Sequence, residues 1–384
     1  MGRSLRIVKW SICTVLSAAC SMSFAATPAE VDASLEKAKA YLYSVQSPDG
    51  TWEAAAAPTD PKRAQSALGG QFSGATALNV YALLSAGEKA SNPKLERAIE
   101  FLKKTDTLGT YALGLRCQVW LMLPQTPEVK SRMQKDVQVL LRTPRTQGNA
   151  QGMYDYTFDK GNAYSHSRAQ YAVLGIWAAE RAGQRIPEGY WPVTERAWIR
   201  NQDPNGGWTY MHPSDTKYST TPGMTAAGVA TLFITQDYVH ANAGALCRGN
   251  VDSPAITKGM EWMAANMDKV ATDKSYDRDF PYPTLYAVER IGVAAGVKYI
   301  GGVDWYQKGA DWLLKKQGKS GSWSGTGIGT GAPHQNTAFA MLFLARGRAP
   351  LVMNKLDYST DPAKPAAWNQ RPRDVANVVR WIST

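Results

Sequence analysis

Two kinds of helical segment alternate along the chain. The first kind is amphipathic and charged, with apolar residues at helical spacing, as in residues 98–103. Its six copies span residues 31–46, 93–105, 127–142, 192–201, 254–267 and 304–317. The second kind is rich in alanine, glycine and aromatic residues. Its six copies span residues 75–87, 109–122, 165–183, 223–238, 283–296 and 334–346.

This alternation predicts the fold class. A helix with one charged face belongs at the surface, whereas a helix that is apolar on all faces must be covered on both sides. Pairs that repeat at a spacing of about 50 residues are typical of repeat architectures. We therefore expect an all-α, (α/α)6 toroid of six outer and six inner helices. Strand signals are nearly absent, which excludes an α/β fold.

A short motif, Q-x3-G-x-W, occurs three times, each time at the end of a charged helical segment. The glutamine can bond backbone groups that lose their helical partners, and the glycine permits a sharp turn. The tryptophan can then fold back as an apolar clamp. We expect these residues to fasten neighbouring helices together rather than to bind a ligand. They are Gln46, Gly50 and Trp52, then Gln202, Gly206 and Trp208, and finally Gln317, Gly321 and Trp323.

The two ends of the chain have a different character from the repeats. Residues 1–25 combine basic Arg3, Arg6 and Lys9 with a short apolar run and a small-residue cleavage site, which is typical of a secretory signal peptide. We therefore expect export to the periplasm or the extracellular space, with no transmembrane segment after cleavage. Residues 26–347 form the expected toroid. Residues 348–384 are rich in proline and predict a strap followed by the start of a further domain.

Composition and charge narrow the function. Apolar residues make up 44% of the 384 residues and charged residues 20%, which excludes a mainly disordered or polytopic membrane protein. The net charge is +11, but no basic stripe with interleaved aromatics is present, so a nucleic-acid partner is not expected. The 13 tryptophans and 18 tyrosines indicate packing anchors or an aromatic-lined cavity. Cys117 and Cys247 remain after cleavage, and whether they pair is open.

The Q-x3-G-x-W motif resembles that of squalene–hopene cyclases and of the protein prenyltransferase β-subunits. Residues 276–286 are similar to the aromatic loop that leads into an inner helix of such cyclases, and residues 333–340 to the start of their last inner helix. The resemblance covers about residues 30–347. It implies a toroid with a central cavity, and it extends to exported bacterial toroid proteins that carry an uncharacterised C-terminal domain.

The sequence departs from these families at the residues that perform their chemistry. The cyclases protonate their substrate with an Asp-x-Asp-Asp motif, and the nearest run here contains only Asp277 and Asp279, with Arg278 between them favouring the ionised form. The prenyltransferases use a zinc ion held by Asp, Cys and His. His334 lies where a family ligand would, but no Asp-x-Cys partner accompanies it. We expect no metal and no cofactor.

The remaining candidate residues lie where loops lead into inner helices. These loops should converge on one mouth of the toroid, because all inner helices run in the same direction. The expected cavity residues are Tyr154, Tyr156, His166, Tyr282, Tyr286 and His334. Glu289 lies within an inner helix, where a charge is costly unless it is paired, and joins Asp277 and Asp279 as a weak catalytic candidate.

Three functions remain open. The first is a non-catalytic binding or scaffold module of a larger envelope protein, with a small-molecule, lipid or glycan ligand or a protein partner. The second is an isoprenoid cyclase or transferase with an altered acid, which needs a closed apolar cavity with one buried acid. The third is a carbohydrate-active enzyme, which needs an open groove with two carboxylates about 5–10 Å apart. The missing acid motif favours the first.

Overall fold

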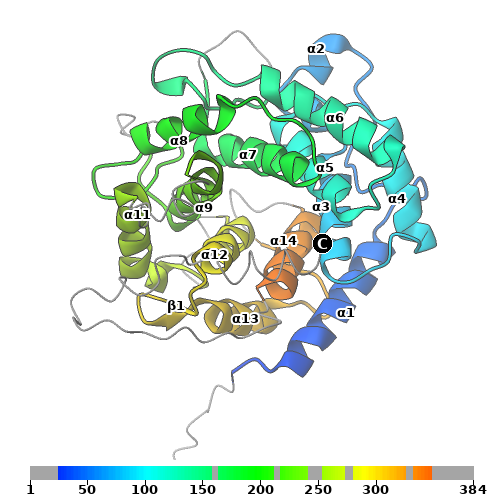
Figure 1. The fold of residues 1–384 in the computed structure, drawn as a ribbon. Helices are drawn as coiled ribbons and strands as arrows, with labels where there is room; N and C mark the ends of the chain where they lie inside the picture. The colour runs from blue at the N-terminus through cyan, green and yellow to red at the C-terminus, as the bar shows by residue number, and fades with distance from the viewer. Residues whose placement is uncertain are drawn as a thin grey trace, which may run out of the picture.

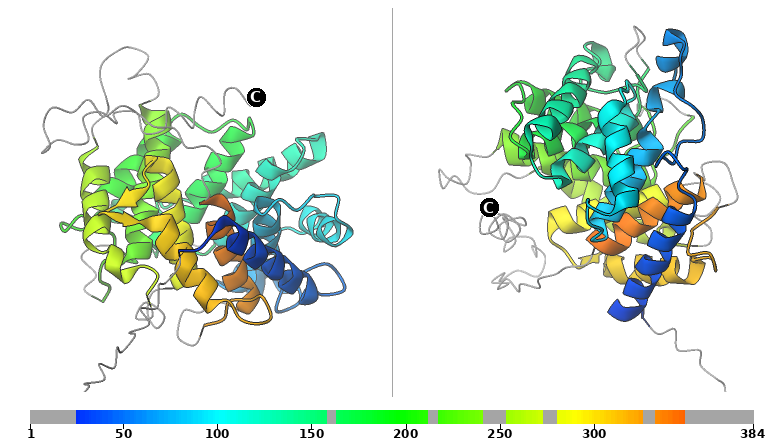
Figure 2. Two further views of the ribbon diagram at one scale, coloured as in Figure 1. Left: turned by 90° about the horizontal axis from the view of Figure 1, so that it is seen from below. Right: turned by 90° about the vertical axis from the view of Figure 1, so that its right-hand side faces the viewer.

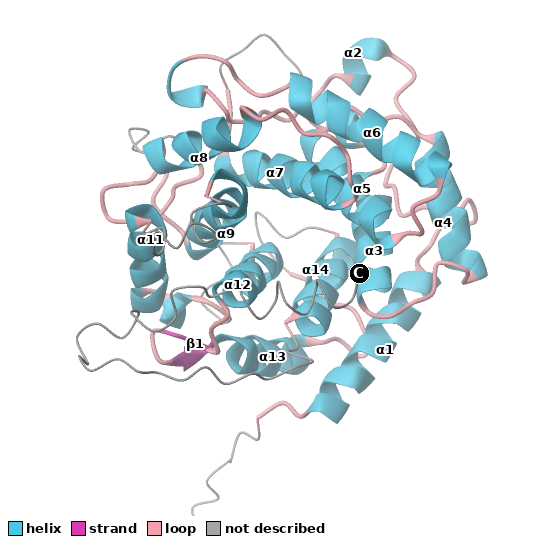
Figure 3. Ribbon diagram, viewed as in Figure 1, coloured by secondary structure: helices cyan, strands magenta, loops and turns pink. Residues whose placement is uncertain are grey.

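The computed structural model describes residues 25–157, 163–211, 217–240, 253–272, 280–325 and 332–347. Over these residues the chain forms two concentric rings of helices (Figures 1 and 3). The outer ring contains α1 (Pro28–Ser44), α4 (Pro93–Lys104), α6 (Pro127–Arg142), α8 (Tyr190–Arg200), α11 (Pro254–Ala265) and α13 (Trp305–Lys316). The inner ring contains α3 (Gly74–Ser85), α5 (Thr110–Met122), α7 (His166–Arg181), α9 (Pro222–Val239), α12 (Pro281–Ala295) and α14 (Pro333–Arg346). The predicted all-α toroid is confirmed.

The rings close because each inner helix packs on its neighbours and α14 returns to α3. The first outer helix, α1, likewise lies against α13 and α14 (Figures 1 and 2). Short elements fill the connections between the described helices. They are α2 (Pro61–Ala64), η1 (Gly69–Gln71), η2 (Gly148–Ala150), η3 (Met267–Lys269) and the antiparallel pair β1 (Tyr299–Ile300) and β2 (Val303–Asp304).

Burial differs between the two rings as the sequence pattern requires. Outer helix α4 buries only Leu95, Ala98, Ile99 and Leu102, which form one stripe at helical spacing. Inner helix α9 buries every residue from Thr225 to Thr235. The inner helices are covered by the outer ring on one side and by one another on the other, so alanine and glycine let them approach closely.

Each motif tryptophan occupies the same position in its repeat. The buried indole of Trp208 donates from Nε1 to the carbonyl oxygen of Trp198 at 3.0 Å, and its backbone N–H donates to the Thr225 hydroxyl at 3.1 Å. These contacts join the end of an outer helix to the next inner helix. The equivalent contacts are Trp52 with Leu42 at 2.9 Å and Thr76 at 3.1 Å, and Trp323 with Leu313 at 2.8 Å and Thr337 at 3.1 Å.

The motif glutamines link successive outer helices. Gln317 Nε2 donates to the carbonyl oxygens of Gly321 and of Ser34 in α1, both at 2.9 Å, and so joins the last repeat to the first. Gly321 has φ of 88°, and a Cβ there would lie 2.3 Å from the Lys37 carbonyl oxygen, so only glycine fits. The matching pairs are Gln46 with Gly50 and Lys94, and Gln202 with Gly206 and Ala255.

The predictions for the two ends of the chain concern residues that the structure does not describe. The expected signal peptide, apart from residue 25, lies outside the described residues, and so do the C-terminal segment 348–384 and Cys247. The thiol of Cys117 is buried and free. In the part of the chain that the structure describes, no helix has the length and apolar character needed to cross a bilayer.

Candidate functional site

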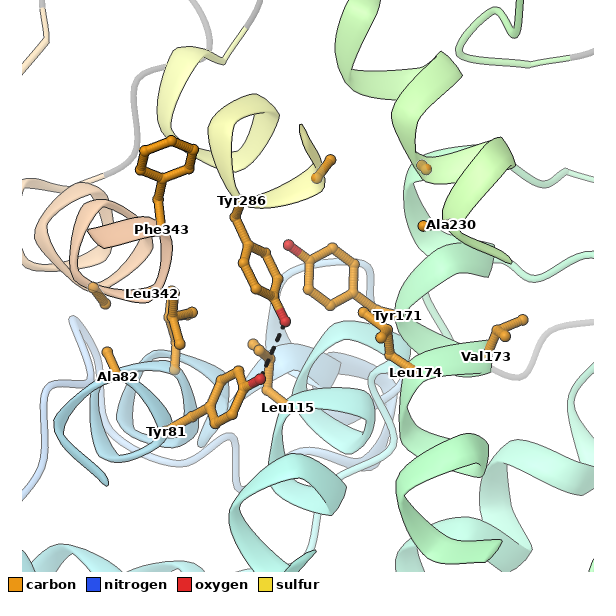
Figure 4. Packing of buried hydrophobic residues seen from close by; sticks show 14 of the residues in the cluster. Tyr81, Ala82, Leu115, Tyr171, Val173, Leu174, Ala230, Tyr286, Leu342 and Phe343 are labelled. Atoms are coloured by element: carbon orange, nitrogen blue, oxygen red, sulfur yellow. Dashed lines mark hydrogen bonds between the residues drawn. The ribbon is translucent and has the colours of Figure 1, made fainter. Parts of the chain in front are cut away.

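Three tyrosines from three inner helices meet at the centre of the ring. Figure 4 shows Tyr81 of α3, Tyr171 of α7 and Tyr286 of α12 pointing toward one another. The hydroxyl oxygens of Tyr81 and Tyr286 are 3.3 Å apart, and their rings meet edge to face with centroids 6.5 Å apart. Burial raises the pKa of Tyr171 and of Tyr286, so both phenols stay neutral. The space inside the ring is therefore crossed by aromatic side chains.

A charged group lies beside these tyrosines. Glu289 of α12 is 1% exposed, and its Oε1 lies 3.7 Å from Nε of Arg346, the last residue of α14. Among the described residues, its Oε2 has no hydrogen-bond partner. Arg346 lies over the Tyr81 ring, with the guanidinium carbon 5.6 Å from the ring centroid, and Arg290 lies over the Tyr286 ring at 5.0 Å. We call Tyr81, Tyr286, Glu289, Arg290 and Arg346 the lumen cluster.

The environment of Glu289 has opposing effects on its pKa. Burial raises the pKa, because a low-dielectric surrounding disfavours the charged form, whereas Arg346 and Arg290 lower it. The net direction is upward. Arg290 also donates from Nη2 to the side-chain oxygen of Gln170 in α7.

A second charged group lies where the chain leads into α7. Asp155 accepts from Arg145 Nη2 at 2.7 Å and is also paired with Arg168 Nη1. The Arg168 guanidinium lies over the ring of Tyr156 at 4.4 Å and over that of Tyr210 at 5.9 Å. All three charged side chains are less than 9% exposed. We call these five residues the α7 N-terminal cluster.

This cluster joins the loops that precede three successive inner helices. The backbone N–H of Thr110, at the start of α5, donates to the Tyr156 carbonyl at 2.9 Å. The N–H of His166, at the start of α7, donates to the carbonyl of Tyr210, in the loop before α9, at 3.0 Å. The loops into α5, α7 and α9 are therefore held to one another by backbone hydrogen bonds and by the buried ion pairs.

The expected cavity residues fall into separate environments. Tyr156 belongs to the α7 N-terminal cluster and Tyr286 to the lumen cluster. Tyr154, His166 and Tyr282 instead contact the outer ring. Their partners are, respectively, the Tyr190 hydroxyl at 3.4 Å, the Trp198 ring at 5.1 Å and the Trp312 ring at 5.8 Å between centroids.

Of the remaining candidates, the structure describes His334 and Glu289 but not the two aspartates. His334 is the second residue of α14, and burial lowers its pKa and so favours the neutral form. Asp277 and Asp279 lie outside the described residues. Over the described ranges, no group of three or more His, Cys, Asp or Glu side chains is arranged to hold a metal ion.

Sequence reasoning missed several residues of both clusters. Tyr81 and Arg346 of the lumen cluster, and the neighbouring Tyr171, lie within inner helices that are buried on all sides. Such burial leaves no periodicity to show which face is central. Arg168 and Arg346 do carry a usable signal, because a charge inside an otherwise apolar helix must be paired. The same argument that selected Glu289 could have selected them.

Comparisons with known proteins find a match in structure and none in sequence. No protein-family model and no curated protein sequence matches the chain. Among solved structures, it is similar to a variant of the type II terpene cyclase MstE from Scytonema, in complex with its substrate geranylgeranyl dihydroxybenzoate. The two chains are 14% identical with a TM-score of 0.48, and the match covers 83% of this chain and 97% of the cyclase. A likeness at this level carries no argument about activity.

Proposed function

We propose that this chain is an exported, non-catalytic binding module built on a cyclase-like toroid. One observation supports this most directly. Among the described residues, the buried carboxylates are Asp136, Asp155 and Glu289. The two aspartates form close ion pairs, Asp136 with Arg116 at 2.8 Å and Asp155 with Arg145 at 2.7 Å. Glu289 has Arg346 3.7 Å away, which opposes the upward shift of its pKa. A guanidinium neighbour favours the ionised carboxylate, whereas an acid that protonates an alkene must carry its proton.

The side chains at the centre of the ring also support a non-catalytic role. A cyclase that folds a polyprene needs one continuous apolar cavity. Here the Tyr81–Tyr286 contact crosses the space inside the ring, and charged side chains flank it. Two guanidinium groups beside the reaction path would disfavour a carbocation, because like charges repel in a low-dielectric site.

A second candidate function is proton-initiated isoprenoid chemistry with Glu289 as the altered acid. It is favoured by the upward shift of the Glu289 pKa and by the aromatic rings of Tyr81 and Tyr286 nearby. Aromatic faces stabilise cations, so the same cluster has two features that such chemistry uses.

Product analysis separates the two candidates. The purified chain is incubated with squalene and with farnesyl and geranylgeranyl diphosphates, and the extracts are analysed by gas chromatography and mass spectrometry. We expect no product above the protein-free control. A product that disappears in Glu289→Gln would establish the second candidate, and one that disappears in Asp279→Asn would place the acid in the segment similar to the cyclase motif.

A further inference from the structure

The lumen cluster carries more positive than negative charge. It holds two guanidinium groups, from Arg290 and Arg346, and one carboxylate, from Glu289. In the described part of the chain, Glu289 has one ion-pair contact, to Arg346 at 3.7 Å, and no carboxylate lies within ion-pair distance of Arg290. With Glu289 ionised, the cluster has a net charge of +1. A charge removed from water is costly unless a partner neutralises it.

The cluster also has unused hydrogen-bond donors. A guanidinium group carries five N–H donors. Arg290 uses one of them on the neutral amide of Gln170, and its buried Nε has no partner among the described residues. The buried Nε of Arg346 also lacks a hydrogen bond within that part of the chain. Two arginines therefore offer N–H groups that no described residue satisfies.

The two arginines lie over a pair of tyrosines that contact each other. Each guanidinium lies over one of two tyrosine rings, and the hydroxyl oxygens of these tyrosines are only 3.3 Å apart. The side chain of Arg346, at the C-terminal end of α14, is 33% exposed, whereas that of Glu289 is 1% exposed. Arg346 is therefore the partly exposed member of this ion pair, at the end of the ring where α14 terminates.

We propose that the lumen cluster binds a ligand through its carboxylate group, held by Arg290 and Arg346. The planar fork of a guanidinium matches the two oxygens of a carboxylate, and a monoanion balances a net charge of +1. A dianion would place excess negative charge beside Glu289. The ring faces of Tyr81, Tyr286 and Phe339 favour an apolar carbon next to the carboxylate. This inference deepens the proposed binding function and rests on it.

The test compares two ligands of the same shape. Octanoate and octanamide are titrated into the full chain by isothermal titration calorimetry, with acetate and inorganic phosphate as further probes. We expect octanoate to bind at least about tenfold more tightly than octanamide. Phosphate and acetate should both bind more weakly than octanoate. Equal affinities for acid and amide, or no binding of octanoate, would overturn the proposal without any variant being made.

Variants then assign the site. Arg290→Gln and Arg346→Gln should each reduce the preference for octanoate over octanamide at least about threefold, because one of the two guanidinium groups that hold the carboxylate is lost. Glu289→Gln should tighten octanoate, because it removes a repelling charge. Arg185→Gln, at an exposed loop position, is the matched control and should change nothing. Circular dichroism checks that each variant is folded. The side chain of Arg346 is 33% exposed, so Arg346→Gln should disturb the packing less than a change at Glu289, which is 1% exposed.

The outcomes distinguish this inference from the proposed function. Turnover of squalene or of a prenyl diphosphate would reject the non-catalytic role whatever octanoate does. Absence of turnover together with equal binding of octanoate and octanamide would reject only the carboxylate site. Dibutyl phosphate, another monoanion, is the last probe of the series. If it bound more tightly than octanoate, the preferred ligand group would be a phosphodiester, and the proposal of a carboxylate site would be overturned.

Discussion

Gly228 in the middle of α9 gives the sharpest test of how the motif tryptophans hold the rings together. A Cβ at this position would lie 2.4 Å from Cδ2 of the Trp208 indole, well inside contact distance. The indole is fully buried and is fixed by its hydrogen bond to the Trp198 carbonyl, so it cannot move aside. Gly228→Ala therefore forces a methyl group into the flat face of the ring.

The effect of Gly228→Ala on the free energy of unfolding should change sign when Trp208 is removed. Alanine in a helix interior is ordinarily better than glycine by about 1 kcal/mol. Overpacking against a fixed ring costs about 1–3 kcal/mol, and we expect Gly228→Ala to lower the free energy of unfolding by about 2 kcal/mol. The Trp208→Ala variant, which we expect to be destabilised by about 3–5 kcal/mol, lacks the indole ring. There the same change should raise the free energy of unfolding by about 1 kcal/mol.

Guanidinium unfolding of the wild type, both single variants and the double variant measures this cycle, followed by far-ultraviolet circular dichroism. The effect of Gly228→Ala in the two backgrounds should differ by about 3 kcal/mol. Gly189→Ala, where no atom lies within 4 Å of the added Cβ, is the control and should change little. If Gly228→Ala were equally destabilising with and without the indole, the packing argument would be refuted.

The other predictions concern hydrogen bonds, backbone strain and buried charge. Gln202→Ala should lower the free energy of unfolding by about 1–2 kcal/mol, because two backbone acceptors lose their donor; chemical denaturation measures it. Gly321→Ala should cost more than about 2 kcal/mol, because a positive φ and a backbone oxygen both oppose a Cβ, and should lower the melting temperature. Arg116→Met should cost about 3–5 kcal/mol by leaving Asp136 unpaired, and Asp136→Leu added to it should restore most of the loss. Burial raises the pKa of Glu289 above 4.5, so the native state binds this proton more tightly than the unfolded chain. The free energy of unfolding should therefore fall as pH rises through that raised pKa, and Glu289→Gln should remove this part of the decline in a pH series of melts.

The sequence was sufficient for the helices and their ring assignment. The segment predicted at 127–142 coincides with α6, because its apolar stripe is strong and Pro127 begins it. The last outer helix, predicted at 304–317, is observed as α13 with Asp304 as its N-cap. The prediction for α12 began two residues late, at residue 283, because two prolines stand in its first turn and both are tolerated there.

The site could be predicted only in part. Glu289 was selected because a charge within an inner helix is costly unless it is paired. Tyr286 was selected because it ends the stretch that resembles the aromatic loop of the cyclases. Which face of an inner helix looks inward could not be read, since burial on both sides removes the periodic signal. His166 illustrates this, because it begins an inner helix and nevertheless packs against Trp198 of the outer ring.

One experiment tests the central claim, that this toroid binds rather than protonates its ligand. Squalene is incubated in D₂O with an excess of the purified chain, so that even a single turnover is visible, and the extract is analysed by mass spectrometry. Proton-initiated chemistry would place a solvent deuteron on carbon. We predict that squalene is recovered unlabelled. A deuterated product above the protein-free control would contradict the account.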